Sequence, residues 1–250
     1  MNLRELAAYL DDYLAIRDIA DYPDAYNGLQ VEGRERVERV ALAVDACAAT
    51  IEGAAAAHAD LLLVHHGLFW GAKAPITGPR YRRLAGLIRN GIALYSCHLP
   101  LDAHPEVGNN HVLARALGLQ IGGCFGEPGG APFGVWAEAE VTRDELVRRL
   151  AETLGTEPRT IAAGPTALRR IAVVSGGAGD WVGLARDAGC DTLVTGEGPH
   201  HTFFAAEELG VNLIYAGHYA TETVGVRALG DHLRAQFGLE TRFLDHPTGL

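Results

Sequence analysis

The chain has 250 residues, of which 48% are hydrophobic and 21% are charged, so it can bury the core of one large domain or of two smaller ones. Its formal net charge of −10 disfavours a nucleic-acid-binding surface, because such a surface has to neutralise phosphates. No apolar run reaches the roughly 18 residues that a membrane span requires, and residues 1–17 lack the apolar centre of a signal peptide, so we expect a soluble cytoplasmic protein.

The first part of the chain is predicted to alternate helices and strands. Apolar residues at helical spacing predict a helix from Leu3 to Leu14, and turn-forming residues predict a loop over 18–36. The elements that follow are a buried strand over 39–45, a helix over 48–57, a strand ending in His65 and His66, a loop over 67–79, a helix over 81–89 and a strand over 92–97.

The second part begins after a stretch that breaks regular structure. Pro100 argues against a regular helix through the residues after His98, and the glycine- and proline-rich residues 122–134 are the best candidate for a boundary. We therefore expect two domains, 1–125 and 126–250, with an approximate boundary and a C-terminus that can pack on the first domain. Residues 135–141 alternate as a strand does, and Thr142 predicts the capped start of a helix.

The sequence also contains an internal repeat. Residues 40–67 align with 171–198 at a constant offset of 131, and the next strand of each half is followed by a histidine with a carboxylate four residues later, His98 and Asp102 in one half and His218 and Glu222 in the other. The alternative is a chance alignment, because generic strand–helix–strand segments also align with one another. A true duplication predicts an α/β fold of two similar units that face each other across a metal-binding cleft.

Metal-ligating side chains gather at the predicted C-terminal ends of strands, where open α/β sheets bind their ligands. These residues are His65, His66, His98, Asp102, Glu197, His218 and Glu222. A mixed set of imidazoles and carboxylates suits Zn, Fe, Mn, Co or Ni, and this set is too large for one ion and suits two. The alternatives are loop histidines in solvent and, for Glu222, an acid that merely complements a helix dipole.

Several motifs resemble those of dinuclear-metal-centre proteins of the NGG-interacting-factor type, which are described as type 2 homologues of GTP cyclohydrolase I. The matching stretches are residues 26–31, 64–70, 98–105, 108–110, 195–197 and 216–222. The chain resembles the short form of that family, without an inserted domain. The resemblance implies two divalent metal ions held by His65, His66, Asp102, His218 and Glu222, with His98 nearby, and it implies a toroidal homohexamer.

The first functional hypothesis is a metal-dependent hydrolase that acts through a metal-activated water, with Glu197 or His98 as general acid or base. Its substrate would be a small molecule, and a nucleotide such as GTP fits the resemblance, although the chain has no phosphate-binding loop of the G-x-x-x-x-G-K-[ST] type. The alternative is a non-enzymatic metal-binding ring that stores, delivers or senses metal or scaffolds a partner.

Two features stay open at this point. His200 and His201 are either solvated residues at a helix start or an added metal contact. Phe69 and Trp70 either anchor an interface between copies of the chain or pack back onto their own domain.

Overall fold

The computed structural model describes residues 1–70, 74–127 and 132–249, so parts of the loops predicted over 67–79 and 122–134 lie outside the described residues. The chain forms two compact units. Unit 1 comprises Met1–Leu101 and Val226–His246, and unit 2 comprises Asp102–Gly225 and Pro247–Leu250. The division thus falls at Asp102 rather than near residue 125, and the chain returns to unit 1 near its C-terminus.

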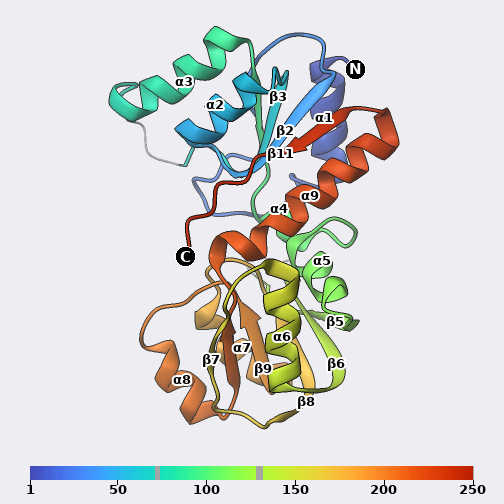
Figure 1. Cartoon of the computed structure of the whole chain (residues 1–250), viewed down its shortest axis with the longest axis vertical. Coiled ribbons are helices and arrows are strands. Elements are labelled where there is room, and N and C mark those ends of the chain that lie inside the picture. Colours follow the sequence, from blue (N-terminus) through green and yellow to red (C-terminus); the bar gives the residue numbers. More distant parts are fainter. Residues whose placement is uncertain (71–73, 128–131, 250) are drawn as a thin grey trace. The chain divides into compact units, whose positions relative to one another are not determined.

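Unit 1 is built on a sheet of mixed direction with the strand order β1-β4-β3-β2-β11 (Figure 1). Its strands are β1 (Gly28–Val31), β2 (Arg39–Asp45), β3 (Leu61–His66), β4 (Ala93–Ser96) and β11 (Glu240–Phe243). Its helices are α1 (Leu3–Tyr13), α2 (Ala48–Ala56), α3 (Gly78–Asn90) and the second half of α9 (His218–Phe237). Strands β11, β2, β3 and β4 run parallel, and β1 pairs antiparallel with β4.

Helices cover both faces of this sheet, as the buried parallel strands require. Alternate strand residues such as Ala43 and Leu62 pack with Ile51 of α2 and Leu87 of α3 in one apolar cluster. On the other face, the Tyr95 hydroxyl donates a hydrogen bond of 3.0 Å to Asp11, which holds α1 against β4. Because both faces are buried, the ligand-bearing ends of the strands are the part of the sheet left open for chemistry.

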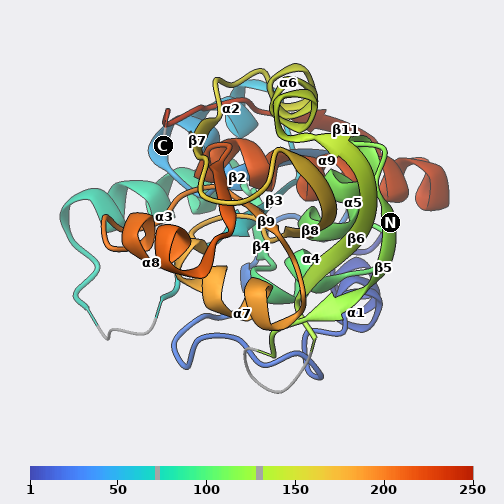
Figure 2. The same ribbon diagram turned by 90° about the horizontal axis from the view of Figure 1, so that it is seen from below.

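Unit 2 contains a second mixed sheet with the strand order β5-β6-β8-β9-β10-β7 (Figure 2). Its strands are β5 (Gln120–Phe125), β6 (Gly134–Thr142), β7 (Arg159–Ile161), β8 (Ala167–Val173), β9 (Thr192–Thr195) and β10 (Asn212–Tyr215). Its helical segments are α5 (Asn109–Ala116), α6 (Arg143–Leu154), η2 (Gly179–Trp181), α7 (Val182–Asp187), α8 (Thr202–Leu209) and the first half of α9. The short helix α4 (Leu99–Ala103) crosses the division between the units.

The two sheets share a topological pattern. Strands β2, β3 and β4 are adjacent and parallel, and so are β8, β9 and β10, in the same chain order. An antiparallel strand flanks each set, β1 beside β4 and β7 beside β10, and these two strands begin at Gly28 and Arg159, 131 residues apart. The offset that aligns the two halves of the sequence therefore also relates two strands that the aligned segments do not contain.

The correspondence extends to one aspartate in each unit that accepts hydrogen bonds from the backbone. Asp60, which is 5% exposed, accepts hydrogen bonds from the backbone N–H groups of residues 38–39, both at 3.0 Å. Asp191, 131 residues later, accepts from the N–H groups of residues 169–170, at 2.7 and 3.3 Å. Asp60 thus satisfies the backbone at the start of β2, and Asp191 satisfies the backbone within β8 just before the residues that pair with β9.

Two local predictions were wrong. Strand β1 lies inside the predicted loop 18–36, because four residues are enough to pair with β4 although turn residues surround them. Helix α4 contains Pro100, which we expected to prevent a helix. Pro100 occupies the first turn, where a backbone N–H has no helical acceptor and proline costs little.

No helix among the described residues is long and apolar enough to cross a membrane.

Candidate metal centre

Three histidines gather at one end of the sheet of unit 1. His65 and His66 end β3, and His98 follows β4, which lies parallel to β3 with Val64 opposite Ser96. The ring centroids of the three pairs lie 4.6, 5.0 and 5.4 Å apart, and each ring offers one nitrogen within 4.8 Å of the others. This end of the sheet therefore presents three imidazoles that can bind one metal ion.

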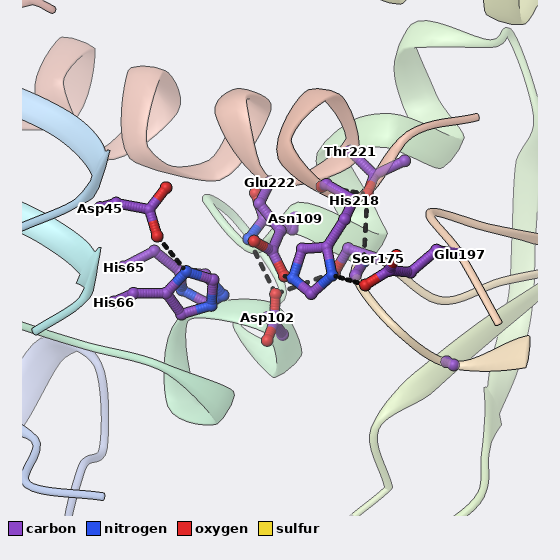
Figure 3. Close-up of polar contacts among 12 residues, drawn as sticks. Asp45, His65, His66, Asp102, Asn109, Ser175, Glu197, His218, Thr221 and Glu222 are labelled. Atoms are coloured by element: carbon purple, nitrogen blue, oxygen red, sulfur yellow. Dashed lines mark hydrogen bonds and ion pairs between the residues drawn. The ribbon is translucent and has the colours of Figure 1, made fainter. Parts of the chain in front are cut away.

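Each of these imidazoles is held through its Nδ1 atom (Figure 3 marks the bond between His66 and Asp45). The acceptors are the Cys97 carbonyl oxygen for His65 (2.9 Å), the Asp45 carboxylate for His66 (2.9 Å) and the Asp21 carboxylate for His98 (2.8 Å). An oxygen that can only accept fixes the proton on Nδ1, which leaves the Nε2 lone pair for a ligand. Outer carboxylate and carbonyl partners of this kind orient histidines that bind metals.

Asp21 is a supporting residue that the sequence analysis missed. Its side chain is 5% exposed, and its second oxygen accepts from the backbone N–H of Leu99 (3.0 Å) and from the Asn27 side-chain amide (2.9 Å). Burial alone would raise the pKa of Asp21, but the hydrogen bonds from His98 and Asn27 lower it below its usual value. Asp21 is therefore a fixed negative charge that positions His98.

In unit 2, two candidate ligands come from the first turn of α9. His218 and Glu222 are one turn apart, and Nε2 of His218 lies 3.1 Å from Oε1 of Glu222. On the other side of the ring, Nδ1 lies 2.7 Å from Oε1 of Glu197, which follows β9 (Figure 3). The hydrogen bond to Glu222, with that to Glu197, raises the pKa of His218 to about 9, although burial opposes the rise.

Asp102 is the third candidate ligand in unit 2, and it is 3% exposed. Its Oδ1 accepts from the Asn109 side-chain amide at 2.8 Å and from the Ser175 hydroxyl at 2.9 Å. Asn109 in turn accepts from the backbone N–H of Gly225 at 2.7 Å, which ties the start of α5 to the middle of α9. Asn109 and Ser175 are thus supporting residues that hold the carboxylate in one orientation.

A glycine makes room for Glu222. Gly176 follows Ser175 and has a φ of +67°, and a Cβ atom at this position would lie 2.4 Å from Oε1 of Glu222. The backbone N–H of Gly176 donates to the Thr221 hydroxyl at 3.0 Å. The loop after β8 therefore packs directly against the start of α9, and a larger residue at position 176 would displace the Glu222 carboxylate or the loop.

Comparisons with known proteins assign the chain to a family. The family model described as Duf34/NIF3 (NGG1p interacting factor 3) matches residues 1–248. The chain belongs to this family. A relative from Pyrococcus abyssi, named GTP cyclohydrolase 1 type 2 homolog, is 45% identical over 254 residues, and a relative of the same name from Deinococcus radiodurans is 43% identical over 249 residues. The alignments cover 100% of both chains for the first, and 98% of this chain and 94% of the other for the second.

Solved structures of similar proteins share the fold over the full chain. The protein ybgI, of unknown function, has a TM-score of 0.93 at 38% identity, and protein TTHA1606 from Thermus thermophilus has a TM-score of 0.88 at 45% identity. Each comparison covers 100% of both chains. The family resemblance and the short form that the motifs predicted are therefore confirmed.

The donors of this NIF3-family chain suit a divalent metal ion. All candidate ligand atoms are imidazole nitrogens or carboxylate oxygens, which Zn, Fe, Mn, Co and Ni accept, and Cys97 contributes only a backbone oxygen. The structure describes the imidazole set within unit 1 and the carboxylate-rich set within unit 2. The meeting of the two sets in one site stays a prediction.

The two histidines after Glu197 differ in their surroundings. His201 lies 2.6 Å from Asp180 through Nε2, and both side chains are well exposed, so this pair contributes little to stability. His200 instead packs edge-on against Phe204, with ring centroids 5.6 Å apart. Neither residue belongs to the candidate metal clusters found among the described residues.

We expect the stability of the metal-free protein to fall as the pH rises from 6.5 to about 9. His218 titrates at about 9 in the folded chain and near 6.5 when unfolded, so its charge stabilises the fold fully below pH 6.5, and this contribution is lost as the pH rises through 9. Thermal unfolding in the presence of a chelator measures the effect. Glu222→Gln removes the main partner of His218 and should make the stability less dependent on pH. An equal fall in stability in Glu222→Gln and in the unchanged protein would assign the pH dependence to other groups.

Proposed function

We propose that this chain binds two divalent metal ions in one cleft between two duplicated α/β units, and that it is a metal-dependent hydrolase of a small molecule. The ligands in this proposal are His65 and His66 from unit 1 and Asp102, His218 and Glu222 from unit 2. The observation that carries it is the set of three imidazoles in unit 1, each with Nδ1 engaged by a carboxylate or carbonyl oxygen. A fold that needed these histidines only for packing would not have to fix all three tautomers.

When bound, two such ions supply Lewis acidity and an activated water near neutral pH. The protein supplies the orientation of the reacting groups. Glu197 is 48% exposed in its side chain and holds His218 through Oε1, so it can orient water or move a proton while it keeps that imidazole in place. His98 lies within the imidazole cluster and serves either as a further ligand or as the acid or base.

The substrate we propose to test first is a nucleotide. The curated relatives are named GTP cyclohydrolase 1 type 2 homologs, and hydrolytic opening of a purine ring uses activated water. The same donor set would also serve a non-enzymatic protein that stores, delivers or senses metal. An assay of turnover by the metal-loaded protein against nucleotides and phosphoesters separates the two functions.

The variant Glu197→Gln is expected to keep its metal and to lose at least roughly 100-fold in turnover, the lower end of what general acid–base groups contribute. The amide retains the shape of the side chain but cannot accept a proton. Metal content per chain and turnover should be measured on the same preparation, with Glu207→Gln on the exposed side of α8 as the matched control. Loss of metal in Glu197→Gln would make Glu197 a ligand, and unchanged turnover would remove it from the mechanism.

We also propose a closed homo-oligomer, six chains built from dimers. Trp70 is 40% exposed although its indole N–H is satisfied by the Gly67 carbonyl oxygen at 2.9 Å, and Ile76 and Tyr81 of the same unit are 55% and 50% exposed. Apolar groups of this size commonly anchor interfaces. Light scattering at micromolar concentration should give a mass well above that of the chain. A single 26.6 kDa species with metal bound would contradict the proposal.

A further inference from the structure

Unit 2 contains a cavity of about 540 Å³ that no candidate metal ligand lines. It lies among strand β7, the loop after β9, the first turn of α8 and the end of β10, and Figure 1 shows β7, β9 and α8 together in unit 2. Its volume falls within the range of small-molecule sites, which runs from roughly 300 to 1,000 Å³. Gly198, the residue after Glu197, is part of its wall.

Four of the nine lining residues carry aromatic rings, namely His200, Phe203, Phe204 and Tyr215. Phe204 lies edge-on to both His200 and Phe203, with interplanar angles of 83° and 84° and centroids 5.6 and 5.5 Å apart. Phe203 and Phe204 are 39% and 51% exposed, so a large part of each apolar side chain contacts water. Two rings at right angles form a corner in which a flat ligand ring can stack on the face of one ring and contact the edge of the other.

The cavity also contains a cation. Arg159 lies directly opposite Tyr215 in the pairing of β7 with β10, so their side chains emerge on the same face. Within the described part of the chain, the Arg159 guanidinium has no ion pair or hydrogen bond, and none of the lining residues is acidic. Arg159 is exposed at the edge of an aromatic cavity that has no acidic lining residue, and this combination suits an anionic ligand.

The wall is held in shape by close contacts. The Thr202 hydroxyl bonds to the Tyr215 hydroxyl, and it also donates to the Pro199 carbonyl oxygen at 2.6 Å. A Cβ atom at Gly198 would lie 2.6 Å from the Tyr215 hydroxyl oxygen, so only glycine allows the loop to pass this close. The part of the wall made by Gly198, Pro199, Thr202 and Tyr215 is therefore fixed before a ligand arrives, which lowers the entropic cost of binding.

We propose that this cavity binds a small molecule that carries a planar aromatic ring and an anionic group, of about the size of a nucleoside monophosphate. The ring stacks in the corner formed by Phe204 and His200, and the anion pairs with Arg159. The proposal requires no metal, and it therefore stands or falls separately from the function proposed for the metal centre.

Calorimetric titration of the full chain with adenosine and guanosine 5′-monophosphates tests the proposal. A chelator is present throughout, so that phosphate cannot bind through metal. At least one nucleotide should bind, and the matching nucleoside and ribose 5-phosphate should both bind roughly tenfold or more weakly, because each lacks one of the two recognised groups. Absence of binding by both nucleotides, or equal binding of ribose 5-phosphate, would overturn the proposal.

Two variants locate the site. Arg159→Gln and Phe204→Ala should each weaken nucleotide binding by roughly tenfold or more, since each removes one of the two contacts. Their matched controls are Arg186→Gln and Leu184→Ala, exposed residues of α7 outside the cavity, which should leave binding unchanged. Circular dichroism checks that Phe204→Ala is folded. Nucleotide binding that survives in Arg159→Gln would place the ligand elsewhere and contradict the proposal.

Discussion

Replacement of Glu222 by glutamine is expected to lower the metal affinity by more than the roughly 10–100-fold that the loss of an outer partner costs. Glu222 is 3% exposed, and its Oε1 lies 3.1 Å from Nε2 of His218, so the substitution removes the charge of a candidate ligand in a buried position. Asp102→Asn should have a similar effect. Metal content per chain after equilibrium dialysis against a competing chelator measures the loss.

The same measurement tests whether the two units share the metals. In a shared site, His66→Ala in unit 1 and Glu222→Gln in unit 2 both lower the affinity of the whole centre, and turnover falls with it. Glu207→Gln provides the control for the loss of one surface charge. If Glu222→Gln leaves the metals held by His65 and His66 unchanged, the shared dinuclear site is wrong and unit 1 binds metal by itself.

Gly176→Ala is expected to lower both the metal affinity and the stability of the protein. The new Cβ would lie 2.4 Å from Oε1 of Glu222, so either the carboxylate or the loop has to move, and the positive φ of 67° adds backbone strain. Gly155 has the same φ of +67° with no atom within 4 Å of its Cβ position. Gly155→Ala therefore isolates the backbone cost, roughly 1–2 kcal/mol.

The comparison of the two alanine variants separates the backbone strain at positive φ from the steric overlap with Glu222. Thermal unfolding should show a larger loss for Gly176→Ala than for Gly155→Ala, and only Gly176→Ala should lose metal. Equal losses of stability with metal retained in both would mean that Glu222 has room to move, and the packing between the loop and α9 would then not position the ligand.

Much of the fold could be predicted because apolar periodicity is a strong signal in long elements. The strands over β2 and β3 and the helix after Thr142 follow the predicted segments, and the Thr142 hydroxyl accepts from the backbone N–H of Glu145 at 3.2 Å as expected. Strand β1 and helix α4 were missed because each has only four or five residues. In segments this short, tertiary pairing decides the structure and local propensity does not.

The candidate ligands could be predicted, but the residues that support them could not. His65, His66 and His218 were found because of their type and because each follows or ends a strand. Asp21 lies 77 positions from His98, and Ser175 lies 73 positions from Asp102. No local pattern in one sequence reports such pairs, since only the folded chain brings them together.

The C-terminal strand imposes an order on folding during synthesis. Strand β11 pairs with β2, with Thr241 opposite Val40, so the edge of the first sheet stays open until about 200 further residues have been made. At 5–20 residues per second this takes roughly 10–40 s. Residues 102–225, which provide nearly all of unit 2, are complete before then. The half of the protein that is translated first is therefore the last to finish folding, and during that interval its exposed strand edge is a target for chaperones and a site for aggregation.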